Sequence, residues 1–339
     1  MKIAYLITAK GNPLYEGKFH NGKKYLTFGQ HSFIYDLVLA IVSNQINIEI
    51  YVDGVDVFPL TESLSSLNIL ISELRRDSKI DADIIIFDTV SDDLLHGNYN
   101  GYKVGIIHNY MIKHSELFYS VCDAIICMTP YAVQKQNTFY PSNKYCLIRQ
   151  GVFCNRFNPQ PQSSFYAINS VLFYSRMDKY KGYAYYEIIQ KFIDLGIHVS
   201  ILGSGELFDY FKTFFSNKIK CFDHIPCQDI PPILNDVDLI VSNGRGVMEG
   251  LSVNKPTIAT GIRYCGLITA DNIIEHRDRN FTGAYILDKD IDLEYDMSLV
   301  SACYKCNPLY FSNLAKQYLC VETFLHQLVK LKLKDNVCI

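Results

Sequence analysis

The stretch SNGRGVMEGLSVNKPTIATG, residues 242–261, joins two apolar runs through one helical pattern. LIVSN ends just as the stretch begins, the turn Gly244–Gly246 follows, and PTIATG starts the next run. Continuous apolar runs separated by helical patterns are typical of parallel strands that are buried on both faces. Glu249 is the only carboxylate of this stretch, so its place in an otherwise buried helix asks for a functional or structural reason.

Similar short runs recur along the whole chain. In the first half they are KIAYLIT, IEIYV, IIIFDT, KVGIIH, AIICMT and KYCLIRQ, and in the second VLFYS, VSILGSG, KCFDHIP, LIVSN, PTIATG and AYIL. Helical patterns such as HSFIYDLVLAIVSNQ, YAYYEIIQKFIDLG and DIPPILNDV lie between them. This alternation predicts right-handed crossovers. We therefore expect an α/β protein with two Rossmann-like, doubly wound parallel-sheet domains facing across a cleft.

The two halves meet near FNPQPQSS, residues 157–164, where prolines and polar residues are typical of a linker. We predict a first domain over residues 1–160, a second over residues 161–315, and a C-terminal helix and tail over residues 316–339. The stretch FSNLAKQYLCVETFLHQLVKLKLK reads as one long amphipathic helix that is expected to pack back toward the first domain.

The segment from Thr8 to Phe28 is long for a connection between a strand and a helix. Its part FHNGKKYLTF predicts a small hairpin that turns at Asn21 and Gly22. The segment is either a loop that binds an acceptor or an insertion without a functional role.

Composition narrows the class of protein. The 339 residues carry a net charge of −3 and no basic run, which argues against nucleic acid as a partner. The eleven cysteines are dispersed in apolar runs, as in reduced cytoplasmic proteins, and the close pair Cys303 and Cys306 lacks the second pair of a closed zinc site. No apolar run reaches the ~20 residues of a membrane span, so any membrane contact is expected to be peripheral.

Cations follow the strand VLFYS in the sequence RMDKYKGY. Arg176 and Lys181 lie at the expected carboxyl end of a parallel strand, near a helix start, where they could hold a diphosphate. An ordinary solvated loop is the alternative. After the next strand, Gly203 and Gly205 would let the backbone approach a ligand closely, although such glycines are common in strand–helix turns.

The turn at the start of the opening stretch could also bind phosphate. Free amides from Gly244 to Val247 are expected at the helix N-terminus. Glu249 lies further along, where its carboxylate suits the two vicinal hydroxyls of a ribose. The alternative is a carboxylate that stabilises the helix dipole by ~1 kcal/mol or less.

These motifs, in this order, resemble the retaining GT-B glycosyltransferases of group 1 (family 4-like), which use nucleotide sugars. The family's Gly-Arg followed by Lys-Gly resembles YSRMDKYKG, and its E-A-x-A-x-G-x-P-V-I resembles EGLSVNKPTIATG. In the first half, TFGQHSFIYDLVLAI, CDAIICMTPYAVQ and LIRQGVFCNRFNP resemble further family motifs. The resemblance covers nearly the whole chain.

The resemblance implies roles for particular residues. Arg176 and Lys181 would stabilise the departing diphosphate, and His108 would face the donor sugar. Glu249 would bind the ribose. The other donor-binding positions that it implies are Gly246 and Val247 through their amides, Ile225 and Pro226 near the base, and Gly29 beside the phosphates, with His31 as a further candidate. Gly203 and Gly205 join these candidates on the argument from their turn alone.

One departure bears on the donor. The family's motif has two glutamates, and the position of the first is occupied here by Val241. Asn243 or Arg245 could substitute for the missing carboxylate, so the identity of the transferred sugar stays open.

The resemblance implies a hexosyltransferase of the cell envelope, acting on a surface glycan or lipid-linked saccharide in polysaccharide biosynthesis. It would work with retention and without a metal or other cofactor.

The alternatives are a nucleotide-sugar epimerase, a GT-B-like binding subunit without activity, a dehydrogenase, for which no GxGxxG follows the first strand, and a metal-dependent transferase. The last would use an Asp-x-Asp site. Asp236–Asp238 and Asp81–Asp83 precede strands and are interpreted as loop or cap residues, whereas YVDGVDV, from residue 51, follows one.

Overall fold

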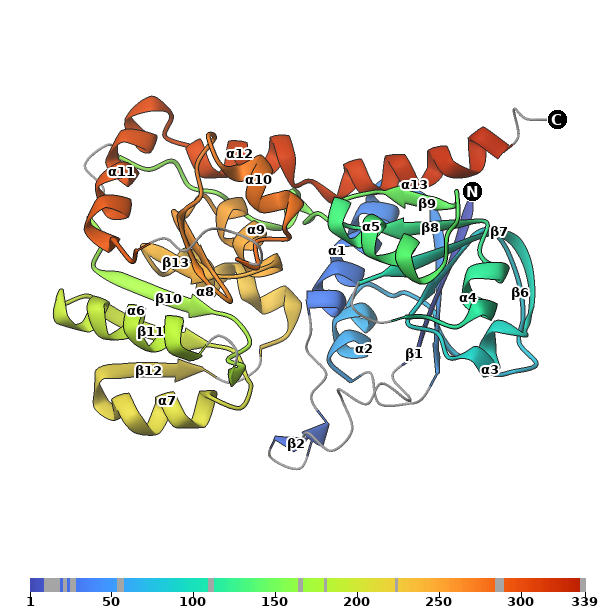
Figure 1. Cartoon of the computed structure of the whole chain (residues 1–339), viewed down its shortest axis with the longest axis horizontal. Helices are drawn as coiled ribbons and strands as arrows, with labels where there is room; N and C mark the ends of the chain where they lie inside the picture. The colour runs from blue at the N-terminus through green and yellow to red at the C-terminus, as the bar shows by residue number, and fades with distance from the viewer. Residues whose placement is uncertain are drawn as a thin grey trace. The chain divides into compact units, whose positions relative to one another are not determined.

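The structure is a computed structural model of the chain. It describes residues 1–8, 19–20, 23–24, 29–53, 58–108, 113–163, 167–179, 182–222, 225–283 and 290–335. The chain divides into two compact units (Figure 1). The first unit comprises Met1–Gly151 and Val321–Ile339, and the second comprises Val152–Cys320.

The first unit is built on a seven-stranded parallel sheet in the order β5-β4-β1-β6-β7-β8-β9. Its strands are β1 (Lys2–Thr8), β4 (Asn47–Asp53), β5 (Ile71–Glu73), β6 (Lys79–Asp88), β7 (Asn98–Ile107), β8 (Ala124–Cys127) and β9 (Tyr145–Leu147). The strand order reverses between β1 and β6. Ligands of open α/β sheets bind at the carboxyl ends of the strands at such a switch point.

The second unit has a six-stranded sheet in the order β12-β11-β10-β13-β14-β15, with only β15 antiparallel to its neighbour among the described pairs. Its strands are β10 (Ser170–Tyr174), β11 (His198–Leu202), β12 (Ile219–Phe222), β13 (Leu239–Ser242), β14 (Thr257–Thr260) and β15 (Tyr264–Leu267). Here the switch point lies between β10 and β13.

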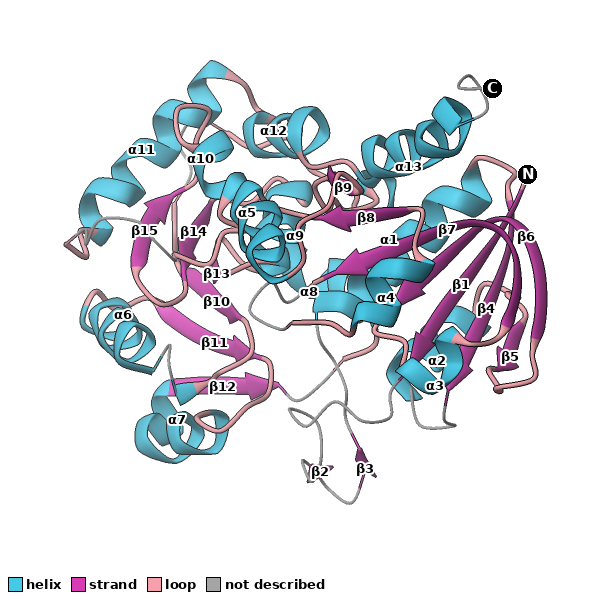
Figure 2. Ribbon diagram, turned by 45° about the vertical axis from the view of Figure 1, so that its right-hand side comes forward, coloured by secondary structure: helices cyan, strands magenta, loops and turns pink. Residues whose placement is uncertain are grey.

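Helices pack on each sheet (Figure 2). Those of the first unit are α1 (Gly29–Ser43), α2 (Phe58–Ser65), α3 (Asp92–Leu95), α4 (Glu116–Val121), α5 (Pro130–Phe139) and α13 (Val321–Asp335). Those of the second are η1 (Cys154–Arg156), α6 (Gly182–Asp194), α7 (Phe208–Phe215), η3 (Ser216–Lys218), η4 (Cys227–Asp229), α8 (Ile230–Asn235), α9 (Arg245–Ser252), α10 (Ile273–Asp278), α11 (Leu293–Cys306) and α12 (Tyr310–Tyr318).

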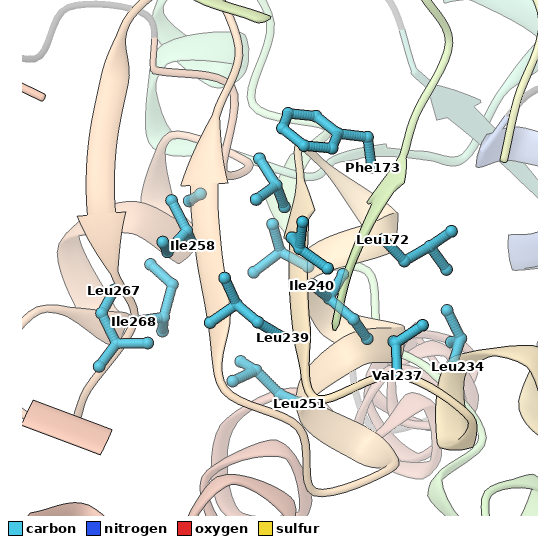
Figure 3. Packing of buried hydrophobic residues seen from close by; sticks show 14 of the residues in the cluster. Leu172, Phe173, Leu234, Val237, Leu239, Ile240, Leu251, Ile258, Leu267 and Ile268 are labelled. Atoms are coloured by element: carbon cyan, nitrogen blue, oxygen red, sulfur yellow. The ribbon is translucent and has the colours of Figure 1, made fainter. Parts of the chain in front are cut away.

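The core of the second unit explains why the opening stretch is apolar. Leu172 and Phe173 of β10, Leu239 and Ile240 of β13 and Leu251 of α9 belong to one buried hydrophobic cluster (Figure 3). All five are fully buried. Burying an aliphatic or aromatic side chain stabilises the folded state by about 1.5–3 kcal/mol, so such burial helps to hold α9 against β13 and β14.

The C-terminal stretch forms two helices, so the prediction of one long helix is wrong. Leu319 and Cys320 separate α12 from α13 because the amide of Val152 donates to the carbonyl of Leu319 at 2.8 Å and Cys320 forms a β-bridge with Val152. The predicted packing on the first domain is confirmed for α13, where the rings of Phe324 and Phe33 in α1 lie 5.0 Å apart between centroids.

The segment predicted as a linker packs within the second unit. Asn254 Nδ2 donates to the carbonyls of Gln160 and Pro308, each at 2.8 Å, and the amide of Gln162 donates to Pro308 at 2.9 Å. The chain crosses between the units at Gly151–Val152 and at Cys320–Val321 instead. The expected boundary at residue 160 therefore falls inside the second unit, and the expected boundary at residue 316 falls inside α12.

Every apolar run predicted as a strand coincides with one wherever the residues are described; AYIL lies outside them. The sequence analysis missed β5 and β15. The predicted hairpin is present as the antiparallel pair β2 (Phe19–His20) and β3 (Lys23–Lys24), and most other residues of that segment lie outside the described ones. None of the described helices combines the length and apolarity that crossing a bilayer requires.

Candidate functional site

Glu249 lies at the centre of a buried ionic cluster in the second unit, with 1% of its surface exposed. Arg156 Nη2 donates to Glu249 Oε1 at 3.3 Å, and Arg245 Nε lies 3.2 Å from the same oxygen. The hydroxyl of Tyr174, the last residue of β10, donates to Oε2 at 2.7 Å. Burial and the Glu249 carboxylate raise the pKa of Tyr174 well above its usual value, so the phenol stays a donor.

Arg156 connects this cluster to the segment expected near a nucleotide base. Its Nη1 donates to the carbonyl of Cys227 at 2.8 Å, and its guanidinium lies 4.5 Å from the ring centroid of Phe157. Cys227 follows directly on Ile225 and Pro226, so the structure brings that predicted pair near Glu249. The sequence analysis missed Arg156 and Tyr174 as site residues. Arg156 lies in LIRQGVFCNRFNP and Tyr174 in YSRMDKYKG. A polar group next to apolar residues in these motifs is the sequence signal that could have identified them.

The expectation of free amides at the start of α9 is wrong. The amide of Gly244 donates to the carbonyl of Phe281 at 3.0 Å, that of Gly246 to Asn243 at 3.2 Å, and that of Val247 to Gly244 at 3.3 Å. The last two are i→i−3 bonds, which commonly satisfy amides in the first turn of a helix. A phosphate at this turn would therefore have to replace these long contacts.

The turn before α9 is packed against the end of β10. Asn243 Nδ2 donates to Ser175 Oγ at 2.6 Å and to the hydroxyl of Tyr185 at 2.7 Å. A Cβ added at Gly246 would lie 2.1 Å from Ser242 Oγ, so only glycine fits there. The structure thus gathers Asn243, Arg245, Gly246 and Glu249 at the switch point between β10 and β13.

Arg176 follows β10 at the same edge of the sheet. Its side chain is 46% exposed, and its Nε and Nη2 both lie 2.8 Å from Asp178 Oδ2. Lys181, the other predicted cation, lies outside the described residues. Of the two predicted cations, Arg176 therefore lies just after the carboxyl end of β10, where it is paired with Asp178.

The predicted glycine turn after β11 has a packing role. A Cβ at Gly203 would lie 1.9 Å from the carbonyl oxygen of Ser175, and one at Gly205 would lie 2.6 Å from that of Met177. These glycines let the turn lie against the loop that carries Arg176. The sequence analysis expected the backbone at both glycines to approach a ligand closely. In the structure it approaches the loop that carries Arg176.

A second polar cluster lies at the switch point of the first unit. His108 follows β7, and its Nε2 lies 2.9 Å from Oδ2 of Asp88, the fully buried last residue of β6. Gln30 Nε2 donates to Asp88 Oδ1 at 2.8 Å, and the hydroxyl of Tyr5 donates to Oδ2. Gly29 begins α1 directly before Gln30, so Asp88 connects His108 to the residue next to Gly29.

Asp88 was missed by the sequence analysis, although IIIFDT shows a carboxylate at the end of an otherwise apolar strand. His31, the further candidate of the sequence analysis, is 4% exposed in α1.

The candidate Asp-x-Asp sites have other partners in the structure. Asp238 Oδ2 accepts from the amides of Asn169 and Ser170 at 3.0 Å each, as a residue that caps the start of β10. Asp81 and Asp83 lie inside β6, so their placement before a strand is wrong. In YVDGVDV, Asp53 ends β4, and residues 54–57 lie outside the described residues.

Within the described ranges, no group of three or more His, Cys, Asp or Glu side chains is arranged to hold a metal ion. Cys303 and Cys306 both lie on α11, the first buried and the second exposed. Burial raises the pKa of the Cys303 thiol.

No family profile matches the sequence, and no curated protein matches it. Solved structures match across its length. HepE from Anabaena, in complex with UDP and glucose, superposes with a TM-score of 0.61 at 13% identity and covers 97% of this chain and 98% of its own. A glycosyltransferase from Rickettsia africae gives 0.61 at 15% identity, covering 98% and 97%. Sucrose-phosphate synthase from Thermosynechococcus elongatus gives 0.59 at 10% identity, covering all of both chains. The two parallel-sheet units and these matches identify the fold of the chain as GT-B.

Proposed function

We propose that the protein is a glycosyltransferase that moves a sugar from a nucleotide diphosphate sugar to a hydroxyl group of an acceptor. The observation that carries this proposal is the GT-B fold over the full chain, with polar residues gathered at the switch point of each sheet. HepE, one of the matched structures, holds UDP and glucose, which supports a nucleotide-sugar donor.

We assign the nucleotide to the second unit. Arg176 would hold the diphosphate together with Lys181, because both cations suit phosphate oxygens. Glu249 would bind the ribose. Its carboxylate is 1% exposed and already accepts from Arg156 and Tyr174, so a ribose can reach it once one of these two side chains moves aside. Arg156 is the more suitable of the two, since its contact is the longer.

The chemistry we propose needs no metal. Negative charge grows on the diphosphate as it leaves, and preorganised cations and amides would stabilise that charge in the transition state. Arg176 and Lys181 supply the cations, and Gly246 and Val247 the amides once their i→i−3 contacts open. We assign His108 to the donor sugar and propose retention of the anomeric configuration. The acceptor we propose is a cell-surface or lipid-linked saccharide, met in the cytoplasm or at the inner membrane face.

Val241 occupies the position where the resembling family carries its first glutamate. It is fully buried in β13, where it pairs with Phe173 and Ile258. An apolar side chain there removes one expected contact to the sugar. A binding subunit without activity is therefore the second candidate.

A thermal-shift panel of nucleoside diphosphates and nucleotide sugars, each with and without EDTA, tests the donor site. Ligand at 100 times its Kd stabilises the folded protein by ~2.7 kcal/mol. We expect one nucleotide to raise Tm in EDTA, and Arg176→Ala to lose that rise. Arg176→Ala is the better variant than Glu249→Ala, because Arg176 is exposed and removing Glu249 would leave two buried guanidinium groups. Lys218→Ala is the matched control, since Lys218 is exposed and precedes β12, at the opposite edge of the sheet.

The nucleotide sugar selected by the panel is then incubated with saccharide acceptors, and NMR follows nucleotide release and the anomeric configuration of the product. Transfer with retention in EDTA supports the proposal. Binding without turnover favours the binding subunit, and a change of the sugar without an acceptor favours an epimerase. Absence of any nucleotide-induced shift rejects the donor site.

A further inference from the structure

We propose that Asp88 is a positioning residue that holds His108 in the tautomer protonated on Nε2, leaving Nδ1 to accept a hydrogen bond from a substrate hydroxyl. The tautomer rests on the contact between His108 and Asp88, whereas the substrate hydroxyl rests on the proposed function.

The argument starts from the chemistry of the pair. An ionised carboxylate can only accept hydrogen bonds, so the imidazole nitrogen that faces it must carry the proton. His108 Nε2 faces Asp88 Oδ2 at 2.9 Å. In a neutral imidazole the other nitrogen is then the acceptor. A buried carboxylate that fixes the tautomer of a histidine in this way is the function of the aspartate in serine-protease triads.

The other side chains that donate hydrogen bonds to Asp88 are neutral, so they do not compensate the negative charge of its carboxylate. Tyr5 and Gln30 both donate to it, and neither carries a positive charge. Among the described residues, His108 is the one hydrogen-bonded partner of Asp88 that can become a cation. Burial and the Asp88 carboxylate raise the pKa of Tyr5 well above its usual value, so that phenol remains a donor.

The neighbourhood also fixes the position of both side chains. Thr89 follows Asp88 with a φ of 56°, an unusual conformation for a β-branched residue. Gln30 Nε2 also reaches Thr89 Oγ1 at 3.2 Å, which ties the start of α1 to this backbone. The ring of Phe33 meets the His108 ring edge-on, with centroids 5.7 Å apart. His108 therefore lies between a carboxylate and an aromatic ring, and both limit its rotation.

His108 retains a reachable nitrogen. Its side chain is 18% exposed, whereas Asp88 is fully buried. Within the part of the chain that the structure describes, Nδ1 has no hydrogen-bond partner. The pair lies at the carboxyl edge of the sheet beside the switch point between β1 and β6, where ligands of such sheets bind.

The tautomer can be measured without any substrate. Two-dimensional ¹H–¹⁵N NMR of histidine-labelled full-length protein, at a pH where the imidazole is neutral, distinguishes protonation on Nε2 from protonation on Nδ1. His108→Gln assigns the signal. We expect Nε2–H in the wild type and loss of that preference in Asp88→Asn, because an amide can donate to Nε2. Tyr5→Phe is the matched control, since it removes one donor to Asp88 and keeps the pair, and it should retain the wild-type pattern.

Two NMR results would overturn the proposal: Nδ1–H in the wild type, or an unchanged Nε2–H signal in a folded Asp88→Asn. The wild-type spectrum alone decides the first, even if the variant does not fold.

Kinetics test the substrate contact separately. We expect Asp88→Asn to lower kcat/KM for sugar transfer roughly 10²-fold, within the range for a positioned hydrogen-bonding group, and Tyr5→Phe to change it less than tenfold. Absence of transfer by the wild type would reject the proposed function and leave the tautomer result standing. Full activity in Asp88→Asn with an altered tautomer would reject the substrate role of Nδ1.

Discussion

Arg156 and Glu249 are 93 residues apart in the chain, yet Arg156 Nη2 lies 3.3 Å from Glu249 Oε1, with 6% and 1% of the two side chains exposed. Arg176 and Asp178 make a comparable pair two residues apart, at 2.8 Å, but Arg176 is 46% exposed. The two arginines therefore form the same kind of ion pair in different surroundings. Burial decides what the loss of each would cost.

Arg156→Ala should destabilise the protein strongly. Removing one partner of a buried ion pair costs about 3–5 kcal/mol when the other charge is left without compensation. Arg245 and Tyr174 remain beside Glu249 in this variant, so we expect a loss toward the lower end of that range. Arg176→Ala should cost less than about 1 kcal/mol, as for exposed pairs. Calorimetry on the whole chain measures both, with the second variant as control. Equal losses in the two variants would contradict the burial argument.

Cys154 and Cys320 should form a disulfide on oxidation. Their sulfur atoms lie 2.9 Å apart, and each residue is close to a point where the chain crosses between the units. Hydrogen peroxide would take two electrons and two protons from the two thiols and be reduced to water. The bond would close a loop across a separation of 166 residues, and closing a loop of ~100 residues is worth up to ~5 kcal/mol in the chain-entropy model.

Peptide mapping under non-reducing conditions identifies the bond, and a reversible rise in Tm on oxidation measures its effect. Cys154→Ser should abolish both. The exposed Cys306 offers an internal comparison, because it should remain open to alkylating reagents. Full alkylation of Cys154 and Cys320 after peroxide treatment would refute the prediction.

Alkaline pH should destabilise the fold, with Tyr185 as one cause. Burial raises the pKa of Tyr185 to about 12 from its ordinary value near 10. The neutral phenol is thus favoured in the folded state, so its stability is complete below about pH 10 and falls between about pH 10 and 12, by up to about 1.4 kcal/mol per pH unit.

Urea unfolding of the wild type and of Tyr185→Phe at pH 8 to 12 measures this slope. The variant loses the hydroxyl that accepts from Asn243, so it should be less stable at pH 8. Its stability should nevertheless fall less steeply above pH 10. Parallel curves for the two proteins would show that Tyr185 does not titrate between the folded and unfolded states as expected.

Local sequence was sufficient for the strands and for the residues next to them. The runs KIAYLIT and VLFYS predict buried parallel strands because period and composition are local properties. The carboxyl ends of those strands are then known, which is why the sequence points to Arg176, Asn243 and His108 as residues at the sheet edges. The helix break at Leu319 could not be predicted, because it depends on a hydrogen bond from Val152, which lies far away in the chain.

What the sequence by itself determined was the class of fold and the edge of each sheet where polar residues gather. What only the tertiary structure decided was which groups those residues meet. The sequence predicted that Glu249 accepts hydrogen bonds from a ligand. In the folded chain, Glu249 is surrounded by Arg156, Arg245 and Tyr174. The resemblance implied that His108 faces a sugar. In the folded chain, its Nε2 also contacts Asp88. The physical reason is that a buried charge needs a partner, and the chain supplies that partner from positions that only the packed sheet brings together.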